Sequence, residues 1–425
     1  MIKELFLFLK KRMLTPIIII ILFAMAFLFD SVRHMWSGYL LILKSPSVLI
    51  SDYLFIGGLG ATLFNVATIM LMNLILLKVL KLKMTGLIFA GLFTIAGFSF
   101  FGKNIFNTLP IYLGIYFYAL LRKLEIKSLI IVILFSTGIS PIVSFLIFGT
   151  GWPLYIGIPA GVIVGILSGF LLPAISMNTM KFHQGFNLYN IGFAMGILSM
   201  LYAALLRSFG INLDLGGPSS TLYHNELMTL ILLLSLSFII GAFLSDKKVY
   251  RKYLSIIKSS GRLVSDFIND YGKDVSMLNV GIMGLISMAM IMLLGFQVGG
   301  ALMGAVLTIM GFAACGKHPR NALPVMFGAY LAVIVTKLSF DSVGIVIAVF
   351  FVTALAPIAG KYGVLIGILA GFLHIVITPL SYYFQGGFDL YNNGFAAGFV
   401  AAIMVPVLDS FSKDKIIDSL PIIKN

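Results

Sequence analysis

The chain has 425 residues, of which 60% are hydrophobic and 10% charged, and its formal net charge is +14. Soluble proteins carry about 25% charged residues, so this composition excludes a soluble globular protein and indicates a membrane protein. The basic excess does not indicate a nucleic-acid partner, because Lys and Arg collect in the cytoplasmic loops of membrane proteins. Cys315 is the only cysteine, which excludes a disulfide or a cysteine metal cluster within one chain.

Apolar segments follow one another along the whole chain, and most are long enough to span about 30 Å of hydrocarbon. In the first half they are 13–30, 52–80, 84–101, 109–122, 128–148, 153–175 and 185–207. In the second half they are 226–244, 274–293, 295–315, 323–336, 340–358, 363–384 and 389–408. The first segment lacks a small-residue cleavage site, so we do not interpret it as a secretory signal. We expect seven helical elements in each half.

Three sequence blocks occur twice in the same order. YLLILKSPSVLISD at 39–52 returns at 253–266 with 8 of 14 identities, and GKNIFNTLPIYLGIY at 102–116 returns at 316–330 with 7 of 15. Both of these blocks are shifted by the same offset in numbering, 214. GFNLYNIGFAMG at 185–196 matches GFDLYNNGFAAG at 387–398 in 9 of 12 positions, at an offset of 202. A duplication of this extent is the usual basis of a transport fold.

An odd number of crossings turns the second copy upside down, and the loop charges agree with this. Lys78, Lys81 and Lys83 have uncharged counterparts in the second copy, whereas the connector 245–265 is rich in basic residues and the connector 31–51 is not. Basic loops mark the cytoplasmic side. With the basic run 10–12 also inside, we expect both termini in the cytoplasm of a multi-pass plasma-membrane protein.

The sequence therefore predicts an all-α polytopic membrane protein made of two inverted-topology repeats. We expect a first repeat at 1–209, a loop at 210–225, an inverted second repeat at 226–410 and a polar cytoplasmic tail at 411–425. The connectors 31–51 and 245–265 show helical apolar spacing and too much charge to span, so we expect amphipathic helices in the interface. Segments 109–122 and 323–336 are short and follow Asn-x-Leu-Pro, interpreted as a turn, which predicts broken or re-entrant helices there.

The first candidate site is the duplicated GFxLYN segment. Its polar residues are Asn187, Tyr189 and Asn190 in the first copy and Asp389, Tyr391 and Asn392 in the second. Flanking glycines and a following apolar helix suit a half-helix whose free N–H groups point into a cavity. Asp389 replaces Asn187, so one half alone has a carboxylate suited to proton or cation coupling. The alternative is an interfacial turn in which Asn and Asp cap helices.

Two further pairs complete the candidate substrate site. Lys103 with Asn107 and Lys317 with Asn321 occupy duplicated positions, where the lysines could hold an anionic solute; the alternative is lysines that snorkel at helix ends. Asn65 and Asn279 lie within apolar runs at the same offset, and interhelical hydrogen bonding is the alternative to a substrate-facing amide.

The motifs GFxLYNxGFAxG and GKxxxNxLP resemble those of an uncharacterised family of bacterial multi-spanning membrane proteins, known as a domain of unknown function. That resemblance covers nearly the whole chain and implies no substrate. The architecture of seven plus seven inverted spans is similar to that of nucleobase and sulfate transporters. Single pieces of the motifs are similar to those of urea channels. We carry no residue roles over from either.

The function that these patterns favour is secondary transport of a small polar or anionic solute by alternating access between the repeats. The alternative is a channel for a small neutral solute such as urea. The sequence has no Walker A loop and no HExxH or CxxC motif, so we expect no enzyme, no cofactor and no bound metal. The expected partners are the lipid bilayer and a small-molecule or ion substrate, without nucleic acid, and a homo-oligomer is left open.

Overall fold

The computed structural model describes residues 14–49, 51–213 and 217–411. The regular structure of these residues is helical, apart from one isolated bridge between Asp52 and Phe101. Nine helices among them are long and apolar enough to cross a membrane, or up to 10 if a bent pair counts as one span. The predicted all-α polytopic membrane fold is confirmed, whereas the basic run 10–12 and the tail after 411 lie outside the described residues.

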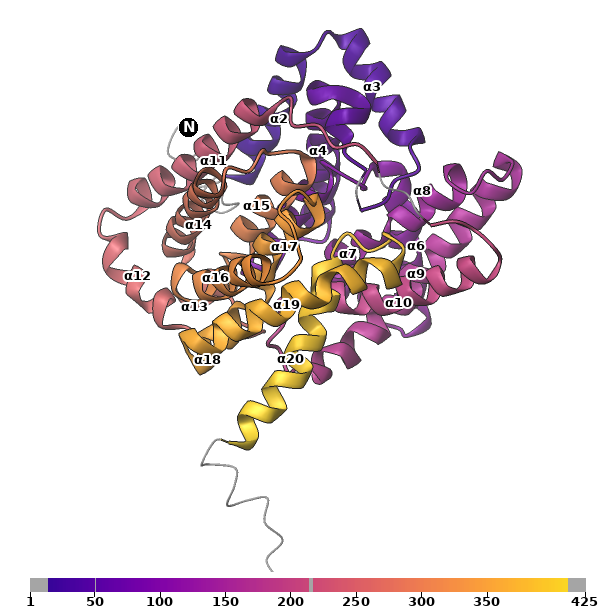
Figure 1. The fold of residues 1–425 in the computed structure, drawn as a ribbon. Coiled ribbons are helices and arrows are strands. Elements are labelled where there is room, and N and C mark those ends of the chain that lie inside the picture. The colour runs from indigo at the N-terminus through magenta and orange to yellow at the C-terminus, as the bar shows by residue number, and fades with distance from the viewer. Residues whose placement is uncertain (1–13, 50, 214–216, 412–425) are drawn as a thin grey trace, which may run out of the picture.

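The first repeat runs from α2 to α10 (Figure 1). Its helices are α2 (Thr15–Phe29), α3 (Val32–Lys44), α4 (Tyr53–Val79), α5 (Gly86–Phe98), α6 (Ile105–Leu121), α7 (Ile130–Ser136), α8 (Pro141–Phe148), α9 (Leu154–Phe182) and α10 (Asn190–Ser208). The 3₁₀ turns η1 (Ile126–Leu129) and η2 (Thr137–Ile139) precede and follow α7.

The second repeat runs from α11 to α20. Its helices are α11 (His224–Ser245), α12 (Val249–Lys258), α13 (Phe267–Asp270), α14 (Lys273–Leu294), α15 (Gly300–Phe312), α16 (Pro319–Val335), α17 (Val343–Phe351), α18 (Ala356–Tyr362), α19 (Val364–Gln385) and α20 (Asn392–Ser410), with the 3₁₀ turn η3 (Val352–Leu355) between α17 and α18. The offset of the repeated blocks also relates both bounds of α15 and α16 to those of α5 and α6, and both bounds of α20 to those of α10.

The repeats are inverted, as the two copies of the short apolar helix demonstrate. Gly86, which begins α5, lies against Ala314, just past the end of α15. Gly300, which begins α15, lies against Phe100, just past the end of α5. The two equivalent helices therefore run antiparallel, side by side, through the middle of the molecule. Small residues allow this close approach, as is usual between helices in membranes.

Each of these central helices is capped by a carboxylate of the other repeat. The N–H of Gly86 donates to Asp266 Oδ1 at 2.8 Å, and the N–H of Gly300 donates to Asp52 Oδ2 at 3.3 Å. Asp52 and Asp266 are themselves repeat equivalents, because they end the first duplicated block. A carboxylate stabilises a helix N-terminus through its unpaired N–H groups and its dipole, so we describe these contacts as crossed caps.

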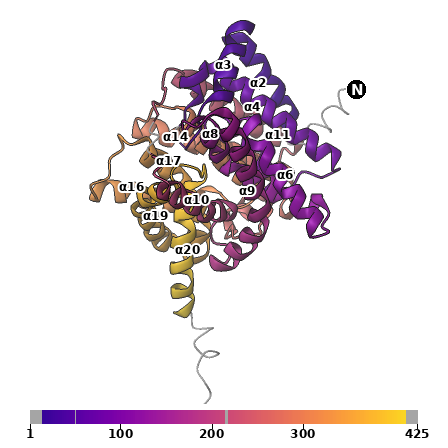
Figure 2. The ribbon, with the colours of Figure 1, turned by 90° about the vertical axis from the view of Figure 1, so that its right-hand side faces the viewer.

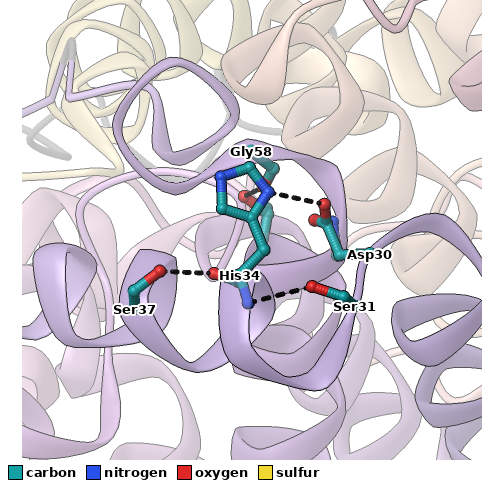
Figure 3. Close-up of polar contacts among 7 residues, drawn as sticks. Asp30, Ser31, His34, Ser37 and Gly58 are labelled. Carbon is teal, nitrogen blue, oxygen red and sulfur yellow. Dashed lines mark hydrogen bonds and ion pairs between the residues drawn. The ribbon is translucent and has the colours of Figure 1, made fainter.

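Helices α2 and α3 meet at 112° in a polar corner, which Figure 3 shows. The Asp30 carboxylate lies 3.3 Å from His34 Nδ1, and its other oxygen accepts the N–H of Gly60 at 2.9 Å. That N–H is free because α4 breaks at Gly58, which has φ 81° and ψ 176°. The break is duplicated: Gly272, with φ 101°, separates α13 from α14.

The amphipathic connectors form the short helices α3 and α12, as predicted. One face of α3 is buried through Met35, Tyr39 and Ile42, and α12 buries Val249 and Ile256. Figure 1 shows α3 at the top of the molecule and α12 at its left-hand side. Longer helices pair within each repeat: α6 lies along α9, as Figure 2 also shows, and α16 lies along α19.

Several predicted boundaries were wrong. The Asn-x-Leu-Pro segments are not turns, because α6 and α16 begin earlier and hold Pro110 and Pro324 in their interiors. Capping boxes fix these earlier starts: Asn107 exchanges hydrogen bonds with Asn104, and Asn321 does so with His318. The GFxLYN segments are non-helical up to Tyr189 and Tyr391, and their last residues, Asn190 and Asn392, begin α10 and α20. Breaks do occur elsewhere, at the 3₁₀ turns beside α7 and α17.

Candidate functional site at the centre of the two repeats

The two GFxLYN segments meet where α10 and α20 begin. Gly192 lies against Tyr391, and Gly394 lies against Tyr189 and Gly192. Each segment is also bound to the opposite repeat, because Leu188 N–H donates to Ala354 O at 2.9 Å and Leu390 N–H donates to Gly138 O at 3.0 Å. The two duplicated segments therefore approach each other inside the protein. Close helix crossing also explains why their glycines recur in both copies.

Tyr189 and Tyr391 form the centre of an aromatic cluster, with ring centroids 4.9 Å apart. Tyr391 contacts Phe98 of the first repeat at 4.5 Å, and Tyr189 contacts Phe312 of the second repeat at 5.0 Å. Phe98 and Phe312 are repeat equivalents, because they end α5 and α15. The tyrosines are thus exchanged between the repeats, and both are buried.

Asn187 and Asp389 occupy equivalent places but differ in their hydrogen bonds. The Asn187 side chain accepts the N–H of Tyr189 at 2.9 Å and donates to the Gly394 carbonyl at 2.8 Å. Asp389 likewise accepts the N–H of Tyr391 at 2.8 Å, but its second oxygen, Oδ2, is buried without a hydrogen-bond partner. Both residues therefore cap a turn, as the alternative interpretation has it, and they do so inside the protein.

Asn190 and Asn392 differ in the same way. Asn190 Oδ1 accepts from Thr179 at 2.8 Å and lies 2.9 Å from His183 Nε2, and its amide donates to Ser176 O at 3.0 Å. We call these four residues the α9 latch, because they tie the start of α10 to α9. The equivalent set in the second repeat is Thr378, Ser381, Gln385 and Asn392.

This second set, the α19 latch, is open. Asn392 Oδ1 and both amide atoms of Gln385 are buried without a partner. Thr378 and Ser381 donate instead to carbonyls one turn back in α19, at 2.8 and 3.4 Å. Buried polar groups are normally paired, so the two latches differ in their hydrogen bonds although they occupy equivalent positions.

Lys103 and Lys317 are fully buried equivalents. Lys103 Nζ donates to Thr137 Oγ1 at 2.6 Å, and Lys317 Nζ donates to Thr353 Oγ1 at 2.7 Å. Lys317 Nζ also donates to the Tyr189 hydroxyl. The threonines lie in the 3₁₀ turns η2 and η3, which interrupt the apolar spans. Snorkelling, the alternative interpretation, is excluded because neither ammonium group reaches the surface.

The four remaining predicted asparagines hold two equivalent turns, 99–103 and 313–317, which we call the lysine turns because they end at Lys103 and Lys317. Asn65 donates to Ser99 O at 2.8 Å and Lys103 O at 2.9 Å. Asn279 repeats both bonds, to Ala313 O and Lys317 O at 2.7 Å. Asn107 and Asn321 bond to the carbonyls of Gly102 and Gly316 at 3.0 and 2.8 Å. Their amides thus serve the backbone, which favours the interhelical interpretation for Asn65 and Asn279.

Two cavities reach the GFxLYN segments: Asn392 lines cavity 1, and Tyr189, Asn190 and Tyr391 line cavity 2. Cavity 1 has a volume of ≈ 590 Å³, opens beside the 295–299 and 337–343 loops, and reaches Phe101 and Asn392 at its inner end. Cavity 2 has a volume of ≈ 70 Å³ and is bounded by Tyr189, Asn190 and Phe312. Cavities that bind small molecules typically measure about 300–1,000 Å³, so only cavity 1 has that size in this conformation.

Sequence reasoning missed Thr137, Thr353, His183 and Gln385. The offset between the two threonines differs from that of each of the three repeated blocks, and a lone threonine in an apolar run carries no other signal. His183 and Gln385 are equivalents at the offset of the GFxLYN blocks, but their chemical types differ. Their contacts in the structure identify them: Thr137 and Thr353 bond to Lys103 and Lys317, and His183 lies beside Asn190. Gln385 is then found as the equivalent of His183.

Comparison with known proteins places the chain in a family but does not name an activity. No curated protein matches it, and no solved structure matches it. A family model described as "Protein of unknown function (DUF1576)" matches residues 31–208 and 245–410, which is most of the chain and follows the duplication. The chain therefore belongs to the DUF1576 family of proteins of unknown function.

Proposed function

We propose that this protein is a secondary transporter that moves a small polar or anionic solute by alternating access between its inverted repeats. The observation that carries the proposal is the relation between the two cavities, which are repeat equivalents of unequal size. Inverted repeats support two mirror conformations, in which each half adopts in turn the structure of the other. A large cavity on one face with a collapsed equivalent on the other is the arrangement expected of one such state.

The equivalence of the cavities rests on their walls. Five wall positions of cavity 1 have their repeat equivalents in the wall of cavity 2: Leu49 with Leu263, Ala301 with Leu87, Ile347 with Ile131, Tyr382 with Met180, and Asn392 with Asn190. The same structural positions thus border ≈ 590 Å³ of space in one half and ≈ 70 Å³ in the other.

The two latches differ in parallel with the two cavities. The α9 latch is closed beside the small cavity, and the α19 latch is open beside the large one. Each buried hydrogen bond contributes about 1 kcal/mol, and a buried polar group without a partner costs about 1–3 kcal/mol. The exchange of one closed latch for the other is thus close to neutral in energy, as a transporter with two accessible states requires.

The aromatic cluster favours a carrier over the alternative, a channel for a neutral solute. Tyr189, Tyr391, Phe98 and Phe312 are buried against one another, and Tyr189, Tyr391 and Phe312 line cavity 2. A channel needs a continuous path, whereas a carrier keeps a barrier on one side of its site at all times. Asp389 is the candidate coupling group, because the duplicated segment carries a carboxylate in this copy alone.

Loop charge gives the orientation of this proposal. The basic residues Lys78, Lys81 and Lys83 lie in the chain that leads to Gly86, on the face opposite Gly300 and the mouth of cavity 1. Basic loops lie in the cytoplasm. Cavity 1 then opens to the outside of the plasma membrane, and the C-terminal end of α20 lies inside.

Cysteine accessibility tests alternating access without a known substrate. Cys315 is buried and is replaced by Ser; Tyr382→Cys then reports on cavity 1 and Met180→Cys on cavity 2. A membrane-impermeant thiol reagent is applied from each side of oriented vesicles. We expect Asn190→Ala, which breaks the α9 latch, to raise labelling at Met180→Cys by roughly tenfold and to lower labelling at Tyr382→Cys, because a loss of about 1.4 kcal/mol changes a two-state ratio tenfold.

The matched control is Asn178→Ala, which removes an exposed amide from α9, the helix to which Asn190 is bound. It should leave both labelling rates unchanged. Two results would reject alternating access. One is labelling of both positions from both sides, which indicates a channel. The other is an Asn190→Ala variant whose two labelling rates do not move in opposite directions.

A further inference from the structure

The two central lysines form no ion pair with any residue that the structure describes. The ion pairs that the described residues do form, such as Lys127 with Glu125 and Lys252 with Asp246, lie at the surface. The exposed fractions of Lys103 and Lys317 are 1% and 0%. A buried charge is costly unless it is paired, and the duplication has kept both lysines.

The surroundings of the lysines are selective for negative charge. Helices α10 and α20 begin beside each other in the same region, so the positive ends of two helix dipoles add to the field. The threonine that each lysine contacts donates its own hydroxyl hydrogen to a carbonyl, Leu134 O or Phe350 O, and therefore offers the lysine a lone pair. Against these groups stands the buried carboxyl of Asp389.

Each lysine contacts residues that line one of the two cavities, although neither lysine is itself a lining residue. Lys103 follows Phe101, which lines cavity 1, and its N–H bonds to the Phe101 carbonyl at 2.9 Å. The Lys317 ammonium lies over the rings of Tyr189 and Phe312, at 4.5 and 5.1 Å from their centroids, and both rings line cavity 2. Lys103 is thus linked through its backbone to the wall of cavity 1, and the Lys317 ammonium lies against two rings of the wall of cavity 2.

The lysines differ in the acceptors that they contact. On the side of the collapsed cavity, Lys317 donates to the Tyr189 hydroxyl as well as to Thr353. On the side of the large cavity, Lys103 donates to Thr137, while the equivalent tyrosine, Tyr391, donates instead to Thr94 at 2.8 Å. A tyrosine hydroxyl is thus an acceptor for the lysine only in the half that is closed.

We infer that Lys103 and Lys317 are a pair of alternating anion sites and that the transported solute is a small organic anion. The carboxylate of the solute is held by Lys103 when cavity 1 is open and by Lys317 when cavity 2 is open. In the closed half, the hydroxyl of Tyr189 or Tyr391 replaces the carboxylate as the partner of the lysine. Phe101, Ala301 and Leu302 give the wall of cavity 1 an apolar part that fits a short hydrocarbon body. Asp52, Asp341 and Lys337 also line this cavity, so the carboxylate of the solute must be held away from the two aspartates. This inference rests on the proposed transport function.

The test compares probes that differ in charge but not in shape. The apparent Tm of the purified full-length protein in detergent is measured with butyrate, butyramide or butylammonium at one pH and ionic strength. A ligand that binds the folded state raises the Tm by mass action. We expect butyrate to raise it by several degrees at millimolar concentration and the other two probes to leave it unchanged. An equal response to butyramide, or no response to butyrate, overturns the inference.

Variants assign the response to the lysine. Lys103→Met should abolish the butyrate-dependent rise, and Lys103→Arg should retain it. Lys78→Met, which removes an exposed lysine at the end of α4, is the matched control and should behave as the wild type. A Lys103→Met protein with an undiminished response overturns the assignment. If that variant does not fold, the charge series on the wild-type protein still decides the class of ligand.

A lipid headgroup could supply the same negative charge. Micelles doped with phosphatidylglycerol are therefore compared with micelles that contain butyrate. A rise with phosphatidylglycerol alone would assign the lysines to lipid and overturn transport of an organic anion. The cysteine accessibility test uses no ligand, so its result does not depend on these measurements. Exchange between the two cavities can persist when butyrate does not bind, and butyrate can bind when the cavities do not exchange.

Discussion

Asn65 and Asn279 form the same pair of hydrogen bonds in the two repeats, and each ties together the ends of a lysine turn. Replacement of Asn65 by Ala leaves the carbonyls of Ser99 and Lys103 without this donor. Each buried group that loses its partner costs about 1–3 kcal/mol. We expect Asn65→Ala to lower the apparent Tm clearly, whereas Asn178→Ala, at an exposed site of α9, should not. Equal Tm values for the two variants would contradict the positioning role.

Asp389 is the residue that breaks the symmetry of the duplicated segment. Asn187 demonstrates that an amide fits this place, because its nitrogen donates to the Gly394 carbonyl of the facing helix. The equivalent acceptor for residue 389 is the Gly192 carbonyl. We therefore expect Asp389→Asn to keep or raise the Tm, since the buried Oδ2 without a partner becomes a donor.

The same variant should lose coupling. If Asp389 is the coupling group, as proposed, it exchanges a proton during transport, which an amide cannot do. Uptake of a carboxylate into proteoliposomes is compared with and without a proton gradient. Asp389→Asn should bind the solute and lose gradient-driven accumulation, while Asn187→Asp serves as the reciprocal variant. Undiminished gradient-driven uptake would show that Asp389 is not the coupling residue.

Glycines set the distance between neighbouring helices. A Cβ on Gly114 of α6 would overlap the Ile166 carbonyl of α9, and one on Gly328 of α16 would overlap the Ile368 carbonyl of α19. Because backbone atoms cannot yield as a flexible side chain can, Gly114→Ala should force α6 and α9 apart, at a cost above the roughly 1–3 kcal/mol of ordinary overpacking. We expect little monodisperse protein in size-exclusion chromatography. Gly344→Ala, which meets only Ser342 Oγ at 3.5 Å, is the matched control and should elute normally.

The helical elements were largely predictable because each depends on local apolar runs. The first repeated block ends at Asp52 and Asp266, which form the crossed caps. The two copies have kept the same residue at this position, so the block was visible in the sequence. The Asn-x-Leu-Pro error has a physical cause: proline blocks only the hydrogen bond to the residue four positions earlier, and the Asn107 capping box fixes a start before Pro110. The latches were not predictable, because their equivalent positions form different hydrogen bonds in the two repeats and His183 is replaced by Gln385.

The inverted arrangement of the whole molecule predicts the sidedness of its loops. Lys81 and Gln297 flank the starts of α5 and α15, which run antiparallel, so they should lie on opposite sides of the membrane. Lys81→Cys and Gln297→Cys, each in the Cys315→Ser background, are treated with an impermeant thiol reagent in intact cells. Gln297→Cys should react and Lys81→Cys should react only after the membrane is opened. Labelling of both in intact cells would rule out the inverted topology.

The crossed caps also determine the order in which the chain can reach its final structure during synthesis. The N–H of Gly86 is satisfied by Asp266, a residue that lies 180 positions later in the chain. The ribosome must therefore make all of the polypeptide that separates them before the N–H of Gly86 has this partner. Until Asp266 has been made, the N–H of Gly86 lacks this partner in the partly synthesised protein. Neither half is a self-sufficient folding unit, and the two separate halves should accumulate only when a cell makes both together.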